Sequence, residues 1–98
     1  MRSMILDNQT DERVKACVYS TSDNIDFVPL PGGVVFLEPH KSVEWFFPPD
    51  AYAPNPEVRF FRPQAIDQLL ARWTNTYSTT IRVQLSKDGN DYKINTYS

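Results

Sequence analysis

Apolar and polar residues alternate with a period of two along most of this chain, a pattern typical of antiparallel strands with one buried face. The clearest alternation runs from residue 80 to residue 85, where every second side chain is apolar: Ile81, Val83 and Leu85. An Asp88-Gly89 pair follows, and Asp-Gly favours the tight turn of a hairpin. Because residues 91–97 alternate again, we predict a C-terminal hairpin over residues 79–97.

The same alternation predicts further strands upstream. Residues 14–19 form one strand, and residues 25–30 form a short edge strand, since Pro29 and Pro31 cannot donate to a strand ladder. Residues 34–47 are predicted to form a second hairpin, whose later strand directs Val43, Trp45 and Phe47 to the core. Residues 57–62 form a strand with Val58 and Phe60 inward.

Only one segment shows a helical period. Its apolar residues stand at positions i, i+3, i+4 and i+7, namely Ile66, Leu69, Leu70 and Trp73, and Pro63 suits a first helical turn. We therefore predict a short helix over residues 64–72. The alternative is a crossover loop that places Ile66 and Leu69 on the core.

These elements sum to about seven short strands joined by proline-rich connections, with at most one short helix. The pattern predicts an all-β fold, either an antiparallel β-sandwich or a small Greek-key barrel. With 98 residues, of which 41% are hydrophobic, the chain has enough apolar material for one core. We expect a single domain over residues 1–98, in which residues 1–11 form a loosely ordered N-terminal segment.

Composition excludes several classes of protein. The single cysteine rules out an internal disulfide framework and a cysteine-based zinc cage. A net charge of -2 without a basic cluster argues against nucleic-acid binding. No apolar run approaches the roughly 18 residues of a transmembrane segment. The N-terminal residues continue into a polar stretch where a signal peptide would be apolar. We therefore expect a cytoplasmic protein, with a mature secreted fragment as the alternative.

No arrangement of residues indicates catalysis. The only histidine, His40, lies at a predicted hairpin tip, and Cys17 lies within a predicted strand, where packing is its usual role. The carboxylates are mostly in turns, without the facing pair that glycoside hydrolysis needs. Asn8-Gln9-Thr10 matches a glycosylation sequon, a match that is frequent by chance. We expect no enzyme activity, no cofactor and no metal site.

Aromatic residues are the strongest candidates for function, at 13% of the chain. Residues 45–47 and 60–61 are aromatic, and they flank the stretch 48–56, in which four of nine residues are proline. Consecutive residues of a strand point to opposite faces. If Phe47 and Phe60 enter the core, Phe46 and Phe61 must therefore leave it. We predict a contact surface around residues 48–56, formed by Trp45, Phe46, Tyr52, Arg59, Phe61 and Arg62.

Three interpretations of this surface remain open. Flat aromatic rings beside Arg suit a small ligand, such as a sugar, a lipid head group or a proline-rich peptide. Exposed aromatics and Arg are also typical of protein–protein interfaces. Alternatively, residues 48–56 and 64–72 cover the rings as a second small core. We expect a non-catalytic interaction module that contacts a protein partner or forms a homo-oligomer. The alternative is a module that binds a carbohydrate or a lipid head group.

Overall fold

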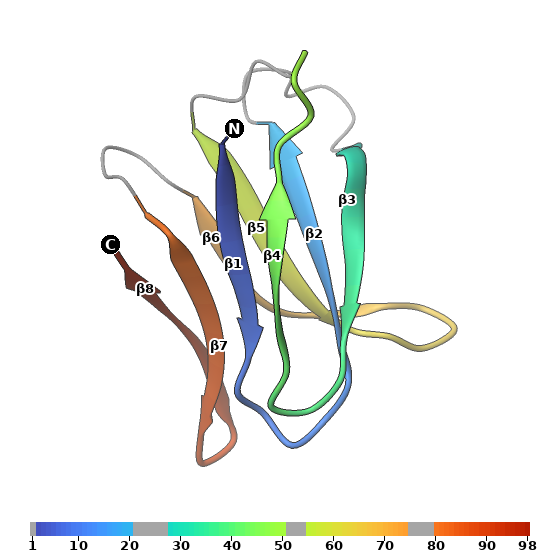
Figure 1. Ribbon diagram of the computed structural model, residues 1–98. Helices are drawn as coiled ribbons and strands as arrows, with labels where there is room; N and C mark the ends of the chain where they lie inside the picture. The colour runs from blue at the N-terminus through green and yellow to red at the C-terminus, as the bar shows by residue number, and fades with distance from the viewer. Residues whose placement is uncertain (1, 21–27, 51–54, 75–79) are drawn as a thin grey trace.

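Eight β-strands and no helix form in the computed structural model, which describes residues 2–20, 28–50, 55–74 and 80–98 (Figure 1). In chain order the strands are β1 (Ser3–Asn8), β2 (Val14–Ser20), β3 (Pro29–Leu37), β4 (Ser42–Phe46), β5 (Pro56–Arg62), β6 (Gln68–Thr74), β7 (Arg82–Asp88) and β8 (Asp91–Tyr97). They make two packed four-stranded sheets, so the predicted all-β fold is confirmed in its sandwich form.

The two sheets have different strand orders. Sheet A has the order β4-β1-β7-β8, and sheet B has the order β3-β2-β5-β6. Every pairing in sheet B is antiparallel, but β1 and β7 run parallel to each other in sheet A. The expectation of a purely antiparallel sandwich is therefore wrong at this pair. The first strand enters the middle of sheet A, where its two neighbours come from distant parts of the chain.

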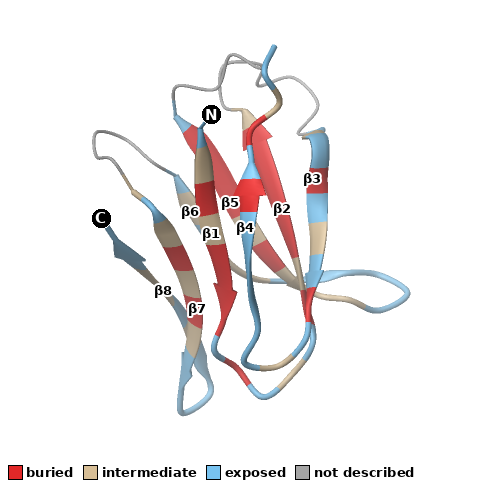
Figure 2. Ribbon diagram, viewed as in Figure 1, coloured by how far each residue is buried: buried red, intermediate tan, exposed pale blue. Residues whose placement is uncertain are grey.

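Alternation along the strands builds the core between the sheets. Leu6, Val83 and Leu85 of sheet A face Val18, Val58 and Phe60 of sheet B, and all six are fully buried. The central strands β1, β2 and β5 are mostly buried, whereas the edge strands β4, β6 and β8 are mostly exposed (Figure 2). The predicted inward positions of Val58 and Phe60 are confirmed.

One predicted hairpin is confirmed and the other is not. Strands β7 and β8 pair through the turn at Asp88-Gly89, where Gly89 has a φ of 63° that favours glycine. Strands β3 and β4 include the predicted strand residues but do not pair, because β3 joins β2 while β4 joins β1. β3 also takes in Pro29 and Leu30 of the predicted edge strand over residues 25–30, of which residues 25–27 lie outside the described residues. The chain crosses from one sheet to the other at residues 38–41, where His40 has a φ of 59°. Alternation predicts strands, but it does not reveal which strands pair.

The predicted helix over residues 64–72 is wrong. Strand β6 occupies most of it, and its register against β5 shifts between Phe60 and Phe61, which pair with Ala71 and Leu69. Leu70 is the extra residue at this shift, so Leu70 and Ala71 both pack against the core. The apparent helical stripe therefore combines two exposed residues, Ile66 and Leu69, with two that pack against the core, Leu70 and Trp73.

The N-terminal segment is also more ordered than predicted. Residues 3–8 form β1, which is hydrogen-bonded to β4 on one side and to β7 on the other. Met4 and Leu6 are core residues, while the polar residues at the end of the strand are buried as well. The polar character of residues 7–12 suggested a loose segment, because the sequence does not show that neighbouring side chains pair with these groups.

Asn8 is the clearest example of such a buried polar group. Its side-chain oxygen accepts hydrogen bonds from the Thr10 backbone (3.0 Å) and hydroxyl (2.6 Å). Its side-chain nitrogen donates to the carbonyl oxygens of Glu12, Leu37 and Glu38 at 2.8–3.1 Å. The amide thereby joins the end of β1 to the end of β3. Because it is fully buried in the folded chain, this sequon is closed to glycosylation.

Candidate functional site

The six residues predicted for the contact surface do not form one patch. Trp45 faces the core and is buried. Its ring nitrogen donates a hydrogen bond to the carbonyl oxygen of Gly32 (2.9 Å), and its ring packs edge-on against Phe47 with centroids 4.8 Å apart. These contacts close the side of the sandwich between β4 and β3. Trp45 is therefore part of the fold, and Tyr52 lies outside the described residues.

Phe46 and Phe61 both leave the core, as strand parity predicts, but they lie on opposite sides of the molecule. Phe46 pairs with Ser3 on the outer face of sheet A and is 50% exposed. Phe61 pairs with Lys15 on the outer face of sheet B, together with Arg59. The prediction treated the strands before and after residues 48–56 as neighbours. The chain instead changes sheet between β4 and β5.

The outer face of sheet B is the more apolar of the two outer faces. One row of side chains crosses all four strands in register, from Phe36 through Lys15 and Phe61 to Leu69. The next row contains Val34, Cys17, Arg59 and Arg72. Within these two rows Val34, Phe36 and Leu69 remain 46%, 48% and 48% exposed. We call these two rows the contact face.

Cations cover part of the rings on this side of the molecule. The Lys15 ammonium lies 5.4 Å from the Phe61 centroid and forms an ion pair with Asp67. The Arg59 guanidinium lies 5.0 Å from the Tyr19 ring and forms an ion pair with Glu57. At the edge, Arg13 lies 4.5 Å from the Phe36 ring and pairs with Glu38 at 2.8 Å. Such contacts stabilise cations beside aromatic rings.

Arg72 differs from these cations. It is exposed and lies directly opposite Arg59, and no carboxylate among the described residues forms an ion pair with it. Like charges opposite each other are unfavourable on a sheet, although Glu57 compensates Arg59 here. The contact face therefore offers one uncompensated cation beside exposed apolar side chains, an arrangement suited to binding a surface with apolar groups and a carboxylate.

Cys17 lies in the middle of this face but is buried beneath its neighbours. Burial raises the pKa of the Cys17 thiol, so the reactive thiolate is disfavoured at neutral pH. Burial and the nearby thiol raise the pKa of Tyr19 to about 12, which keeps its hydroxyl protonated. These groups act as packing and hydrogen-bonding groups, and their chemistry does not indicate a nucleophile.

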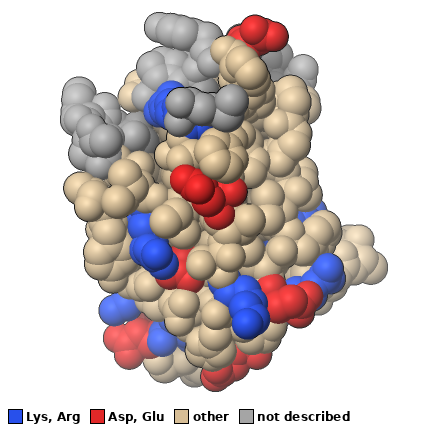
Figure 3. Space-filling model, in the orientation of Figure 1, with Lys and Arg blue, Asp and Glu red and all other residues tan. Residues whose placement is uncertain are grey.

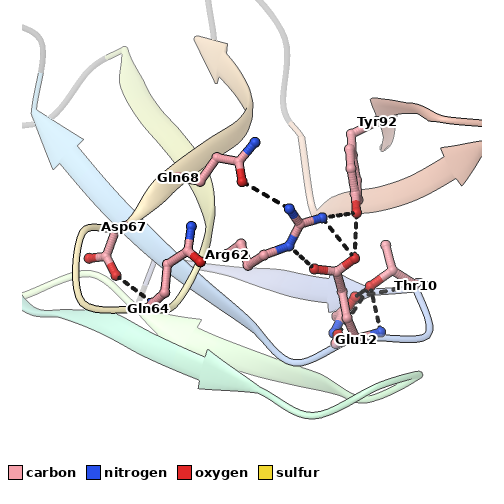
Figure 4. Close-up of polar contacts among 8 residues, drawn as sticks. Thr10, Glu12, Arg62, Gln64, Asp67, Gln68 and Tyr92 are labelled. Atoms are coloured by element: carbon pink, nitrogen blue, oxygen red, sulfur yellow. Dashed lines mark hydrogen bonds and ion pairs between the residues drawn. The ribbon is translucent and has the colours of Figure 1, made fainter.

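Arg62 belongs to a separate polar cluster that ties the two sheets together (Figure 4). Its guanidinium donates to both carboxylate oxygens of Glu12 (2.6 and 3.2 Å), to the Tyr92 hydroxyl (2.7 Å) and to Gln68 (2.9 Å). Tyr92 also donates to Glu12. Arg62 ends β5 in sheet B and Tyr92 lies in β8 of sheet A. The hydrogen bonds from Arg62 and Tyr92 lower the pKa of Glu12.

The outer face of sheet A is dominated by polar contacts around Asp7. This carboxylate is almost fully buried and accepts hydrogen bonds from Arg82 (2.9 Å), Gln84 (3.0 Å) and Gln9 (2.8 Å). Burial alone would raise the pKa of Asp7, but the hydrogen bonds from Gln84, Gln9 and Arg82 outweigh it and lower the pKa. On the side of the molecule seen in Figure 3, acidic and basic side chains alternate in small groups.

The metal-ligating and nucleophilic side chains are dispersed over the described parts of the chain. No group of three or more His, Cys, Asp or Glu side chains among them is placed to hold a metal ion. His40 is exposed in the turn after β3, where its Nε2 lies 2.8 Å from Asp11. Cys17 is buried within sheet B, so the two residues do not form a dyad. No helix of membrane-spanning length and apolarity occurs in the described parts of the chain.

Val34, Phe36, Leu69 and Arg72 were missing from the predicted surface. Strand parity alone identifies the first two: if Leu37 and Val35 face inward, Val34 and Phe36 face outward. Leu69 and Arg72 were hidden by the incorrect helix, so no signal in the sequence placed them on this face.

Comparison of the chain with protein-family models, with curated proteins and with solved structures finds no significant match.

Proposed function

We propose that this chain is a non-catalytic interaction module that binds another protein through the contact face of sheet B. The observation that carries the proposal is the exposure of Val34, Phe36 and Leu69 beside Arg72 on one face. Aromatic residues and Arg are enriched in protein interfaces, where they contribute most of the binding energy. Exposed apolar residues that share a surface indicate interaction more strongly than scattered ones.

The dimensions of the face favour a protein over a small ligand. The row from Phe36 to Leu69 crosses four strands, a span of about 14 Å at the usual strand spacing. The face is the flat outer surface of a sheet, while small-molecule sites are usually concave. A protein surface can cover the whole row at once and can place a carboxylate against Arg72.

Affinity capture with matched variants tests the proposal. Leu69→Lys and Arg72→Glu change the contact face, and Phe46→Lys changes an equally exposed apolar residue on the opposite side. We expect the unmodified chain and Phe46→Lys to capture the same protein from an extract of the source cells. The two contact-face variants should lose it. Binding should then be reproduced with the purified partner.

Two results would overturn the proposal. A purified partner that binds Leu69→Lys and Arg72→Glu as tightly as the unmodified chain would place the interface elsewhere. A hit on a glycan or lipid array that Phe61→Ala abolishes, without any protein partner, would identify a small-ligand module instead.

A further inference from the structure

Sheet B ends at β3, and no described strand pairs with the outer edge of β3. An edge strand presents unpaired backbone N–H and C=O groups that can pair with another strand, and proteins usually protect such edges with charges, prolines or bulges. The other edge strands each carry at least one charged residue: Glu44 in β4, Arg72 in β6, and Asp91 and Lys93 in β8. β3 carries none.

The first half of β3 is protected in other ways. Pro29 and Pro31 lack the N–H group that a ladder needs. The register against β2 shifts between Cys17 and Tyr19, which pair with Val34 and Pro29, so residues 30–33 leave the regular ladder. Gly33 belongs to this irregular segment, and a Cβ there would lie 2.7 Å from the carbonyl oxygen of Leu30. Residues 29–33 are therefore unsuited to pairing with another strand.

The second half of β3 has no proline, bulge or charged residue of its own, although the ion pair between Arg13 and Glu38 lies beside Phe36. Residues 34–37 are Val-Val-Phe-Leu, all with high preference for strands and all in regular register with β2. Val34 and Phe36 are nearly half exposed, and Val43 of the adjacent β4 is 38% exposed. A charge-free apolar edge of this kind is a site of association between chains.

The connection between β5 and β6 adds a further apolar group near this edge. It is held over β2 by the ion pair between Asp67 and Lys15, and Lys15 pairs with Phe36 in β3. In the view of Figure 1 this connection projects past the lower end of β3. Ile66 within it is 85% exposed, the largest value among the exposed large hydrophobic residues described.

We propose that a second copy of this chain pairs with the free edge of β3, antiparallel, about a two-fold axis at Val35. In an antiparallel pair, residues directly opposite each other point to the same face of the sheet. A two-fold axis that passes through a residue paired with itself therefore places the cores of both copies on the same face of the joined sheet. This register places Val34 opposite Phe36 twice and Val35 opposite itself. Aromatic residues opposite β-branched residues are favourable cross-strand pairs.

The second copy fits this edge because the edge is complementary to itself. Residues 34–36, which pair across the axis, carry no charge, and each copy satisfies the backbone groups that the other leaves unpaired along this short segment. The two B sheets then form one continuous eight-stranded sheet, in a closed isologous dimer. The inference rests on the proposed function, since Val34 and Phe36 belong to the contact face.

Analytical ultracentrifugation of the full chain over a wide concentration range tests this pairing. We expect a monomer–dimer equilibrium for the unmodified chain and for Phe46→Lys. Phe36→Lys should sediment as a monomer, because it places a lysine beside the symmetry axis in each copy. Val34→Lys gives a second disruption if Phe36→Lys does not fold, and circular dichroism checks both for the native β-spectrum.

Each of three results would overturn the inference. These are a monomer at every concentration, assemblies that grow beyond the dimer, and a dimer that folded Phe36→Lys and Val34→Lys retain. The inference can fail while the proposed function holds: a chain that is monomeric, and whose purified partner is lost on Leu69→Lys, would retain the contact face and exclude only the β3 pairing.

Discussion

The outer faces of the two sheets are built from the same strand alternation but differ in the burial and hydrogen bonding of their side chains. On sheet A, Asp7 is almost fully buried because Arg82, Gln84 and Gln9 donate hydrogen bonds to it. On sheet B, Val34, Phe36 and Leu69 remain nearly half exposed. The outer face of sheet A surrounds a buried carboxylate with hydrogen-bond donors and exposes Phe46 and Tyr97 on its edge strands, whereas the outer face of sheet B has Phe61 between exposed Phe36 and Leu69.

This difference separates the face that should contribute most to stability from the face that we propose for binding. Removing a hydrogen-bond partner from a buried charge leaves that charge uncompensated, so changes around Asp7 should destabilise the fold. Exposed side chains contribute little to folding, so changes at the contact face should affect association and leave the fold intact. Substitutions on the outer face of sheet A should therefore lower folding stability, and substitutions on the contact face should change association.

The largest difference in stability is expected between substitutions of two neighbouring residues on β5. Phe60 is fully buried in the core, and Phe61 is half-buried on the outer face. Phe60→Ala should lower the free energy of unfolding by about 3–5 kcal/mol, because it leaves a cavity. Phe61→Ala should lower it by about 1 kcal/mol. Urea denaturation measures both, and equal losses would contradict the assignment of the two faces.

The next largest effect on stability is expected at Asp7, on the outer face of sheet A. Asp7→Asn removes the charge that Arg82 and Gln84 stabilise, and we expect a loss of about 1–3 kcal/mol in the free energy of unfolding. Glu44→Gln, at an exposed position on the same face, should change it by less than about 0.5 kcal/mol. A neutral effect of Asp7→Asn would show that the network is replaceable by uncharged hydrogen bonds.

Stability should fall in acid because the pKa values of Asp7 and Glu12 are lowered in the folded chain. The folded chain then binds fewer protons than the unfolded chain, so stability present at neutral pH is lost as the pH falls below the ordinary carboxyl range and through the lowered pKa values. Urea midpoints against pH measure this loss. Glu12→Gln should flatten the dependence, and Tyr92→Phe should flatten it less. An unchanged dependence in Glu12→Gln would contradict the role of Arg62.

The smallest effect on folding is expected at the contact face. Leu69→Ser should change the free energy of unfolding by less than about 0.5 kcal/mol, since Leu69 is nearly half exposed. Thermal unfolding of a dilute sample measures it. A loss of several kcal/mol would mean that Leu69 belongs to a second internal core, and the contact face would then be a packing surface.

Much of the fold could be predicted from local patterns, but the arrangement of strands in sheets could not. Strands β2, β5, β7 and β8 were predicted by alternation, and Phe60 and Phe61 were correctly assigned to opposite faces. β1 was missed because its buried polar groups depend on partners such as Arg82, which lies 75 residues away. β6 was mistaken for a helix because the exposed apolar residues Ile66 and Leu69 stand at helical spacing from Leu70 and Trp73, which pack against the core.

The predicted site failed for a related reason. Parity shows that Phe46 and Phe61 leave the core, but it does not show that they leave through different sheets. That depends on β4 pairing with β1 and β5 pairing with β2, and both pairings join residues far apart in sequence. A contact surface can be predicted only after the strands have been assigned to sheets.

Backbone amide NMR spectra recorded over a dilution series compare both outer faces in one experiment. We expect concentration-dependent shifts at Val34–Leu37 and at neighbouring residues of the contact face. We expect none at Ser3–Asn8 or Arg82–Asp88 in sheet A. Shifts confined to sheet A, or equal shifts on both faces, would contradict the claim that sheet B carries the contact surface.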